Sequence, residues 1–240
     1  MKQGILYIVA TPIGNLGDIT KRAIEILSAV DFVVCEDTRV AGGLLHHMGI
    51  KKELISLHRH SSEEKIEMVI RRISDGENAA YVSDNGTPGI SDPGQKLIQK
   101  SKIKSQNDGN EIQIIPIPGP SALTAAVSVS GIVDKEFYFA GFLPKKKGRQ
   151  TKLKELSALK CPVVIYESAQ RIERTLKDIS VFFAADTEIF IAREMTKKFE
   201  EYWSGKIADI ISGLKNHKIK GEFVVIIKNS KLRSQNVIEN

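Results

Sequence analysis

The sequence has few cysteines and no long hydrophobic run. Its 240 residues include two cysteines, Cys35 and Cys161, each in a short apolar segment. Two such thiols are typical of reduced core cysteines and argue against the disulfide framework of a small secreted domain. No stretch approaches the roughly 18 apolar residues of a membrane span, and the first apolar run is too short for a signal peptide. We therefore expect a cytoplasmic protein without a membrane partner.

Several common catalytic and nucleotide-binding motifs are also missing. The sequence contains no G-x-G-x-x-G loop, no Walker lysine loop and no G-x-S-x-G nucleophile turn. These absences argue against dehydrogenases, nucleotide hydrolases and serine hydrolases. His58 and His60 lie close together, but no further cysteine or histidine stands at the spacing of a metal ligand. We therefore expect no metal site.

Positive charge is in excess, and it is unevenly distributed. The formal net charge is +6, which favours an anionic partner. Two groups of basic residues stand out: Lys145, Lys146, Lys147, Arg149 and Lys152, and then Lys215, His217, Lys218 and Lys220. Such groups can bind the phosphates of a nucleic acid, and solvated loops between core elements are the alternative.

Short β-branched segments alternate with segments of helical periodicity. The expected strands cover residues 4–10, 31–35, 54–57, 79–82, 112–115, 137–140, 163–166, 189–192, 199–203 and 223–227. The alternation predicts an α/β fold with largely parallel sheets covered on both faces. The stiff segment P-I-P-G-P marks a boundary near residue 116. We expect an N-terminal α/β domain over 1–116, a C-terminal α/β domain over 117–228 and a polar tail over 229–240.

Polar residues gather where the expected strands end. The segment over residues 83–94 reads S-D-N-G-T-P-G-I-S-D-P-G, in which glycine and proline shape a loop and Asp92 with Pro93 would open the next helix. Glu36, Asp37 and Arg39 follow the second strand, where helix capping by Asp37 is the alternative. Ligands of open α/β sheets gather outside the carboxyl ends of the strands, so a binding site is expected at these loops.

A set of motifs in order gives a more specific indication. They read V-A-T-P-I-G-N-L-G-D-I-T from Val9, C-E-D-T-R from Cys35, V-S-D-N-G-T-P-G-I-S-D-P-G from Val82, P-I-P-G-P-S-A from Pro116, G-F-L-P-K from Gly141, Y-E-S from Tyr166, R-E-M-T-K from Arg193 and K-G-E from Lys220. From about residue 4 to residue 228 the chain resembles the bacterial 16S ribosomal RNA 2′-O-ribose cytidine methyltransferases, a branch of the tetrapyrrole methylase superfamily.

The resemblance implies a class III methyltransferase fold, with two α/β domains and the cofactor S-adenosyl-L-methionine in the cleft between them. It implies methylation of a cytidine ribose in 16S rRNA of the 30S ribosomal subunit by a homodimer, and no role for DNA. By motif, the cofactor contacts fall on Pro12, Ser83, Asp84, Thr87, Ile90, Ser121, Ala122, Tyr166, Glu167 and Met195.

The catalytic step needs a group that accepts the proton of the ribose hydroxyl. The candidates for this acceptor at strand ends are Lys197, Glu167, Asp37, Glu36 and Glu194, and Arg39 completes the catalytic candidates without being a proton acceptor. The sequence does not choose among them. Arg39 and Lys197 could instead hold the phosphates that flank the target, and pairing with Glu36, Asp37 or Glu194 is the alternative.

The chain departs from the family pattern at three places. Asn85 replaces the alanine of S-D-A-G, Ala169 and Gln170 replace a Pro-His pair, and the sequence stops soon after Ile227 where many relatives continue. Asparagine tolerates a left-handed backbone, so we expect cofactor binding to survive, whereas a role of the family's histidine does not carry over. The short tail is expected to reduce the RNA contact area.

Two rival interpretations remain open. A small-molecule tetrapyrrole methylase would share the fold and the cofactor, but the basic groups and C-E-D-T-R count against it. A nonenzymatic RNA-binding assembly factor would keep the fold alone, and the retention of Asp84, Thr87 and Ser121 counts against that interpretation.

Overall fold

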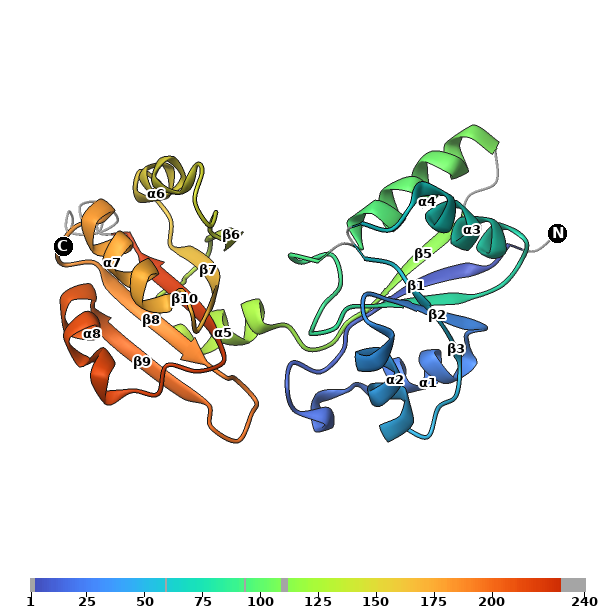
Figure 1. The fold of residues 1–240 in the computed structure, drawn as a ribbon, viewed down its shortest axis with the longest axis horizontal. Helices are drawn as coiled ribbons and strands as arrows, with labels where there is room; N and C mark the ends of the chain where they lie inside the picture. The colour runs from blue at the N-terminus through green and yellow to red at the C-terminus, as the bar shows by residue number, and fades with distance from the viewer. Residues whose placement is uncertain (1–2, 59, 93, 109–111, 230–240) are drawn as a thin grey trace, which may run out of the picture. The chain divides into compact units, whose positions relative to one another are not determined.

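The computed structural model describes residues 3–58, 60–92, 94–108 and 112–229. The chain divides into two compact units, Met1–Ser121 and Ala122–Asn240, each built around one five-stranded sheet (Figure 1). The predicted α/β class is confirmed in both. Pro93 and the polar tail beyond residue 229 lie outside the described residues.

The first unit contains a wholly parallel sheet with the strand order β3-β2-β4-β1-β5. Its strands are β1 (Ile5–Val9), β2 (Phe32–Cys35), β3 (Glu53–Ser56), β4 (Ala79–Val82) and β5 (Gln113–Ile117). Val82, the last residue of β4, is level with Val9 in β1 and with Cys35 in β2, while Val9 is level with Ile117. These strands therefore end together, and the loops that follow them share one edge of the sheet.

Two pairs of helices cover the two faces of this sheet (Figure 1). The helices are α1 (Lys21–Ala29) and α2 (Thr38–His47) on one face, and α3 (Glu63–Ser74) and α4 (Gln95–Asp108) on the other. Successive strand residues point to opposite faces, so Val33 packs against the first pair while Phe32 and Val34 pack against the second. Ala23 and Leu27 bury the predicted face of α1, whose first turn is capped by the Thr20 hydroxyl.

The second unit contains a mixed sheet with the order β6-β7-β10-β8-β9. Its strands are β6 (Tyr138–Phe142), β7 (Val163–Ser168), β8 (Glu188–Arg193), β9 (Glu201–Lys206) and β10 (Glu222–Lys228). Only β6 and β7 pair in parallel; β10 is antiparallel to β7 and β8, and β9 is antiparallel to β8. The expectation of a largely parallel second sheet is therefore wrong.

The physical cause lies between β8 and β9. Residues 194–200 are too few for the helical crossover that a parallel connection needs, so the chain reverses there. The following helix α8 (Ile207–Gly213) carries the chain across to β10, which keeps the direction of β9 and enters the sheet between β7 and β8. This one short connection thus makes both β9 and β10 antiparallel to β8.

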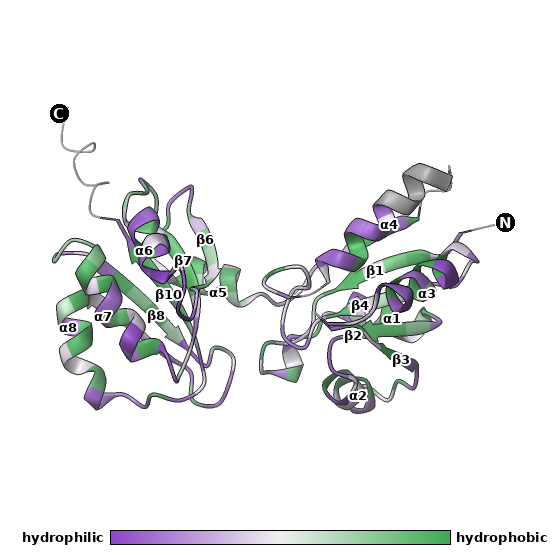
Figure 2. Ribbon diagram, turned by 45° about the horizontal axis from the view of Figure 1, so that its top comes forward, coloured by the Kyte–Doolittle hydropathy of each residue, from purple (hydrophilic) through white to green (hydrophobic). Residues whose placement is uncertain are grey.

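The helices of the second unit bury a hydrophobic core against the sheet. They are α5 (Ala122–Ser130), α6 (Arg149–Ser157), α7 (Ile172–Phe182) and α8. Ile165, Val225 and Trp203 of the sheet pack with Leu176 and Ile207 of the helices. Figure 2 shows β8 as mostly hydrophobic, whereas α7 alternates between hydrophobic and hydrophilic residues. This alternation is typical of a helix that covers a core on one side.

Two local features differ from the sequence-based expectation. α4 continues to Asp108 through residues with no apolar period, because lysine and glutamine favour a helix without packing. Leu97 and Ser101, near its start, are buried. β5 extends to the buried Ile117, two residues beyond the expected strand, and the compact units divide after Ser121. Among the described residues, every helix is too short or too polar to span a bilayer.

Candidate cofactor and catalytic site

The loop after β4 folds back onto the end of β1. The carbonyl oxygen of Gly86 accepts hydrogen bonds from the backbone N–H of Thr11 at 3.0 Å and from the hydroxyl of Ser83 at 2.8 Å. Gly86 has a φ of +80°, and an added Cβ would lie 3.0 Å from the side chain of Ile13. Glycine therefore permits both the curl and the close approach. Pro12 is buried beside this junction.

The loop after β5 joins the same edge. The hydroxyl of Thr87 donates to the carbonyl of Pro120 at 2.9 Å, and Gly119 approaches Ala10 so closely that an added Cβ would lie 3.0 Å from the alanine Cβ. The loops that carry Pro12, Ser83, Thr87 and Ser121 are thus held together at the carboxyl edge of the sheet, where the sequence places a binding site.

Asp92 fixes the far half of the loop. Its carboxylate accepts hydrogen bonds from the N–H of Gly94 at 2.7 Å, from the N–H of Gly89 and from the hydroxyl of Tyr81 at 3.4 Å. α4 begins at Gln95, so Asp92 braces the loop as well as preceding the helix. Ile90, a predicted cofactor contact, is half-buried within this braced segment.

Acidic residues gather where β2 and β4 end. The backbone N–H of Asp37 donates to Oδ1 of Asp84 at 3.1 Å, which links the two loops. Partial burial raises the pKa of Asp84, and the negative charges of Asp37 and Asp92 add to the shift against the opposing hydrogen bond. Burial together with Asp84 and Asp37 raises the pKa of the Cys35 thiol to about 11. Cys35 is therefore an inert core thiol at neutral pH.

The carboxylate of Asp37 makes two interactions. It caps α2 by accepting the N–H of Arg39 at 2.8 Å, and its Oδ2 holds the Arg39 guanidinium at 2.6 Å. Hydrogen bonds from the Arg39 side chain and backbone lower the pKa of Asp37 to about 2. The capping alternative is realised here, and Asp37 is a weakly basic carboxylate. Glu36, on the same loop, is half-buried.

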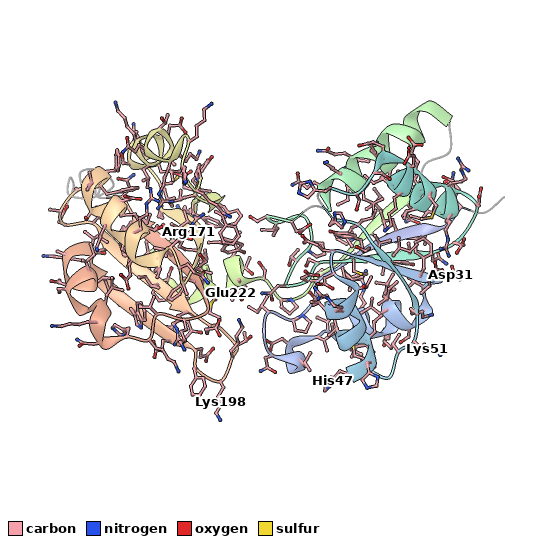
Figure 3. The ribbon with its side chains drawn as sticks, in the orientation of Figure 1. Asp31, His47, Lys51, Arg171, Lys198 and Glu222 are labelled. Atoms are coloured by element: carbon pink, nitrogen blue, oxygen red, sulfur yellow. The ribbon has the colours of Figure 1, made fainter. Side chains whose placement is uncertain are left out.

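In the second unit, Glu167 lies in a buried polar network. Its side chain is 0% exposed and forms an ion pair with Arg171 at 2.8 Å; Oε2 also accepts the hydroxyl of Thr175 at 2.6 Å. The network continues to Arg149, which donates to Thr175 and pairs with Asp178. It joins β7, α6 and α7, and Arg171, labelled in Figure 3, directly precedes α7. Glu167 is thus directed into the core of its unit.

Lys197 is held between two carboxylates. Its ammonium donates to Oε1 of Glu194 at 2.8 Å and to Oε2 of Glu222 at 2.9 Å, with Glu222 at the start of β10 in Figure 3. Burial opposes the charge, but the two carboxylates raise the pKa of Lys197. Lys197 is therefore a fixed cation at neutral pH. The structure shows its pairing with Glu194, which the sequence had left open beside phosphate binding.

The loop that carries Lys197 has an unusual backbone. Glu194 and Thr196 have φ values of 50° and 65°, a region that non-glycine residues rarely occupy. The turn places Met195 inside the unit at 7% exposure. The hydroxyl of Thr196 is buried and has no hydrogen-bond partner within the described part of the chain. Strain of this kind is often retained at ligand sites, and the hydroxyl suits a polar ligand group.

The remaining predicted contact, Tyr166, lies beside the first turn of α5. Partial burial raises the pKa of its hydroxyl, although a hydrogen bond with the backbone of Leu123 opposes the shift. Ala122 begins that helix and is half-buried. Tyr166, Ala122 and the loop of Met195 belong to the second unit, whereas the loops around Asp84 belong to the first.

Comparison with known proteins gives the family. Residues 5–211 match the family model described as tetrapyrrole (corrin/porphyrin) methylases. The chain belongs to this family. It is 42% identical to ribosomal RNA small subunit methyltransferase I of Synechocystis sp. over 225 residues, 93% of this chain and 78% of the relative. It is 43% identical to the protein of the same name from Thermotoga maritima, over 93% of this chain and 98% of that one.

Solved structures agree on the fold. Cobalt precorrin-4 methyltransferase is 17% identical with a TM-score of 0.66, covering 92% of this chain and 93% of that one. Uroporphyrin-III-C-methyltransferase from Thermus thermophilus is 17% identical with a TM-score of 0.60, covering 99% and 98%. These likenesses show that this tetrapyrrole methylase has the two-sheet α/β fold of its family.

The structure of this methylase corrects the prediction for the first basic group. Arg149 is only 3% exposed, and its guanidinium is used in the network with Asp178 and Thr175. Lys145, Lys146 and Lys147 are exposed. In the second group, the His217 ring packs on Trp203 at 4.0 Å, while Lys215, Lys218 and Lys220 are exposed. Lys152 is half-buried and pairs with Glu155, so within these two groups the exposed lysines are the ones available to an anionic partner.

Several residues that organise the site were not predicted from the sequence. They are Thr11, Arg171, Thr175, Thr196, Gly221 and Glu222. Thr196 and Glu222 lie within the family motifs, so the motifs could have indicated them. Thr175 lies on α7, whose sequence shows only the periodicity of a packed helix. Gly86, rather than the tolerant Asn85 beside it, takes the left-handed conformation in this loop. No group of metal ligands occurs among the described residues.

Proposed function

We propose that this protein is an S-adenosyl-L-methionine-dependent methyltransferase that modifies the 2′-hydroxyl of a cytidine ribose in 16S rRNA. The observation that carries the proposal is the 42% identity to ribosomal RNA small subunit methyltransferase I over 93% of the chain. The choice of cytidine and of the 2′-hydroxyl rests on the motif resemblance. We further propose a cytoplasmic homodimer that acts on the 30S subunit.

The cofactor is proposed to contact the residues that its family motifs indicate, with the enclosed Glu167 supporting them rather than touching the cofactor. In the first unit, these contacts belong to the loops braced by Gly86 and Asp92, whose backbone is curled and polar. In the second unit, the unpartnered hydroxyl of Thr196 beside Met195 suits a polar ligand group. When bound, S-adenosylmethionine supplies a methyl group activated by its sulfonium. The protein mainly has to orient the ribose hydroxyl, which can contribute roughly 7–11 kcal/mol to lowering the barrier.

The charged candidates divide into different roles. The protonated Lys197 suits an electrostatic contact with phosphate rather than proton acceptance, because its pKa is raised. Asp37 is ionised but weakly basic, and Glu167 is enclosed by Arg171 and Thr175. Asp84 is exposed at the sheet edge, so its carboxyl group is accessible to cofactor or substrate, and its raised pKa makes it a stronger base than Asp37. We assign Asp84 to the site and Glu167 to its support.

A methyl-transfer assay tests the function. Small ribosomal subunits from cells that lack the modification are incubated with protein and labelled methyl donor, and the RNA is digested to nucleosides for mass spectrometry. We expect 2′-O-methylcytidine at one position. Transfer to a tetrapyrrole precursor with none to the subunits would instead support the small-molecule methylase, and cofactor binding without transfer to either would support an assembly factor.

Asp84→Ala is expected to weaken cofactor binding by about tenfold to a hundredfold, the equivalent of one charged hydrogen bond of about 1.5–3 kcal/mol. Calorimetry with S-adenosylmethionine measures the change. Asp75→Ala is the matched control, because Asp75 is an exposed carboxylate that ends α3, before β4 rather than after it. Equal affinities in wild type and a folded Asp84→Ala protein would remove Asp84 from the cofactor site.

Changing Lys145, Lys146 and Lys147 together to alanine should weaken RNA binding and flatten its salt dependence. Each lost phosphate contact lowers the slope of log affinity against log salt by about 0.7 for a single strand, so the total is up to about 2. Arg149 stays in place because its loss would disturb the buried network. Lys21, Lys51 and Lys96 changed to alanine form the control with equal charge. A slope equal to that of the control would make this group a solvated loop.

A further inference from the structure

An exposed aromatic ring stands among lysines at the turn between β8 and β9. Phe199 is 62% exposed, and the ammonium groups of Lys198 and Lys218 lie 5.6 and 5.5 Å from the centre of its ring. Figure 3 shows Lys198 at the end of this turn, away from the sheet. Lys218 comes from the segment before β10, so two distant parts of the chain contribute to one surface.

A buried arginine holds these two parts in place. Arg193 is 3% exposed; its Nη1 donates to the carbonyl of Phe199 at 3.1 Å and its Nε to the carbonyl of Lys220 at 2.7 Å. The same guanidinium pairs with Glu201 at 3.4 Å. The aromatic ring and the second lysine segment are therefore positioned before any partner arrives, which reduces the entropy lost on binding.

The lysines of this surface are available for a partner. Within the described residues, no ion pair or hydrogen bond engages the ammonium groups of Lys198 and Lys218, apart from their contact with the ring. Glu200 accepts the N–H of Thr196 and keeps its negative charge, while Glu222 pairs with Lys197. In the part of the chain that the structure describes, neither carboxylate pairs with Lys198 or Lys218, so both ammonium groups can contact phosphates.

This combination fits one class of partner. Successive bases of single-stranded nucleic acid stack on aromatic rings, while lysines contact the backbone phosphates. A second copy of this chain fits less well, because a symmetric contact through Phe199 would bring the lysines of both copies together.

We propose that Phe199, Lys198 and Lys218 form a stacking platform for an unpaired base of single-stranded RNA, with the two ammonium groups on the flanking phosphates. This surface deepens the proposed function, since it names how the same RNA substrate is held beside the loop of Lys197. On binding, a base covers a face of the Phe199 ring, and the exposed lysines turn from the ring to the phosphates.

Fluorescence anisotropy with a short labelled single-stranded RNA tests the platform without cofactor. Phe199→Ala should weaken binding by about tenfold, the effect of one lost stacked base. Phe199→Trp should keep the affinity, and quenching of its exposed indole should report the stacked base, because the native Trp203 is buried at 7% exposure. Lys198→Ala with Lys218→Ala should lower the salt slope by about 1.4, from two contacts of about 0.7.

Val181→Ala is the matched control, because Val181 is an aliphatic side chain that is 77% exposed on α7 of the same unit. Equal RNA affinity for wild type and Phe199→Ala would overturn the platform, as would a Phe199→Ala effect that appears only as a change of oligomeric state in sedimentation. The methyl-transfer assay on wild type separates the two proposals. Transfer to 16S rRNA with an unchanged Phe199→Ala affinity rejects the platform alone, whereas RNA stacking without transfer rejects the proposed reaction alone.

Discussion

Glu167→Ala is expected to lower the free energy of unfolding by about 3–5 kcal/mol, the cost of leaving one partner of a buried ion pair alone. The substitution leaves the guanidinium of Arg171 and the hydroxyl of Thr175 facing an empty space where the carboxylate stood. Chemical denaturation followed by circular dichroism measures the change. Loss of methyl transfer in this variant should follow the loss of folded protein.

Glu173→Ala is the matched control for this prediction. Glu173 lies on the first turn of α7 next to the network but is exposed, so its removal should cost less than about 1 kcal/mol. Glu167→Gln offers a second measurement, because the amide keeps the volume and one hydrogen-bond acceptor. A Glu167→Ala protein that melts like wild type yet fails to transfer methyl would contradict the supporting role and return Glu167 to the catalytic candidates.

The fold of the first unit could be read from the sequence to a large extent. Its strands are short β-branched runs, and residues such as Ile66, Val69 and Ile73 repeat at helical spacing and are all buried. The parallel order follows because each helix is long enough to return the chain to the same edge. Local pattern and tertiary packing therefore agree there.

For the second sheet, the sequence pattern did not predict the direction of the strands. Its strands were found, but their direction depends on the length of the connection between Arg193 and Glu201, which does not alter the apolar pattern of either strand. A period of two gives the faces of a strand and says nothing of its direction. The short connection between β8 and β9 determines the strand direction. The assumption that a helix follows every strand was wrong there.

For the candidate site too, the sequence could predict some features and not others. Motif position predicts a site at the loops around Asp84 and Met195, which follow strands β4 and β8. It could not tell a residue that faces a ligand from one that faces the core: Glu167 and Arg149 are charged, yet both are buried in one network. The partners that bury them, Thr175 and Asp178, come from α7 and carry no motif.

Lys197→Ala is expected to lower the single-turnover methylation rate by about tenfold to a hundredfold, the worth of one charge-assisted hydrogen bond to phosphate. The cation is positioned by Glu194 and Glu222, and Glu194 is itself fixed by donation from the N–H of Glu222 at 2.9 Å. Gly221 permits this packing, because a Cβ there would collide with the Glu194 carboxyl group. Cofactor affinity and melting temperature should change little, since the ion pair is partly exposed.

Lys228→Ala supplies the matched control. Lys228 pairs with Glu188 at 2.8 Å in a similarly half-buried setting, but at the opposite end of β10. It should show the same small change in stability and no change in rate. Lys197→Arg should restore much of the rate, because the charge is kept.

The pH dependence separates a fixed cation from a proton acceptor. The raised pKa of Lys197 keeps the ammonium charged throughout the range of about pH 6 to 9, below the ordinary lysine value, so the rate ratio of wild type to Lys197→Ala should stay constant across it. An acceptor must be neutral to take the proton, and its contribution would therefore grow as the pH rises. A ratio that increases tenfold per pH unit would make Lys197 the base, and a ratio of one at every pH would remove it from the reaction.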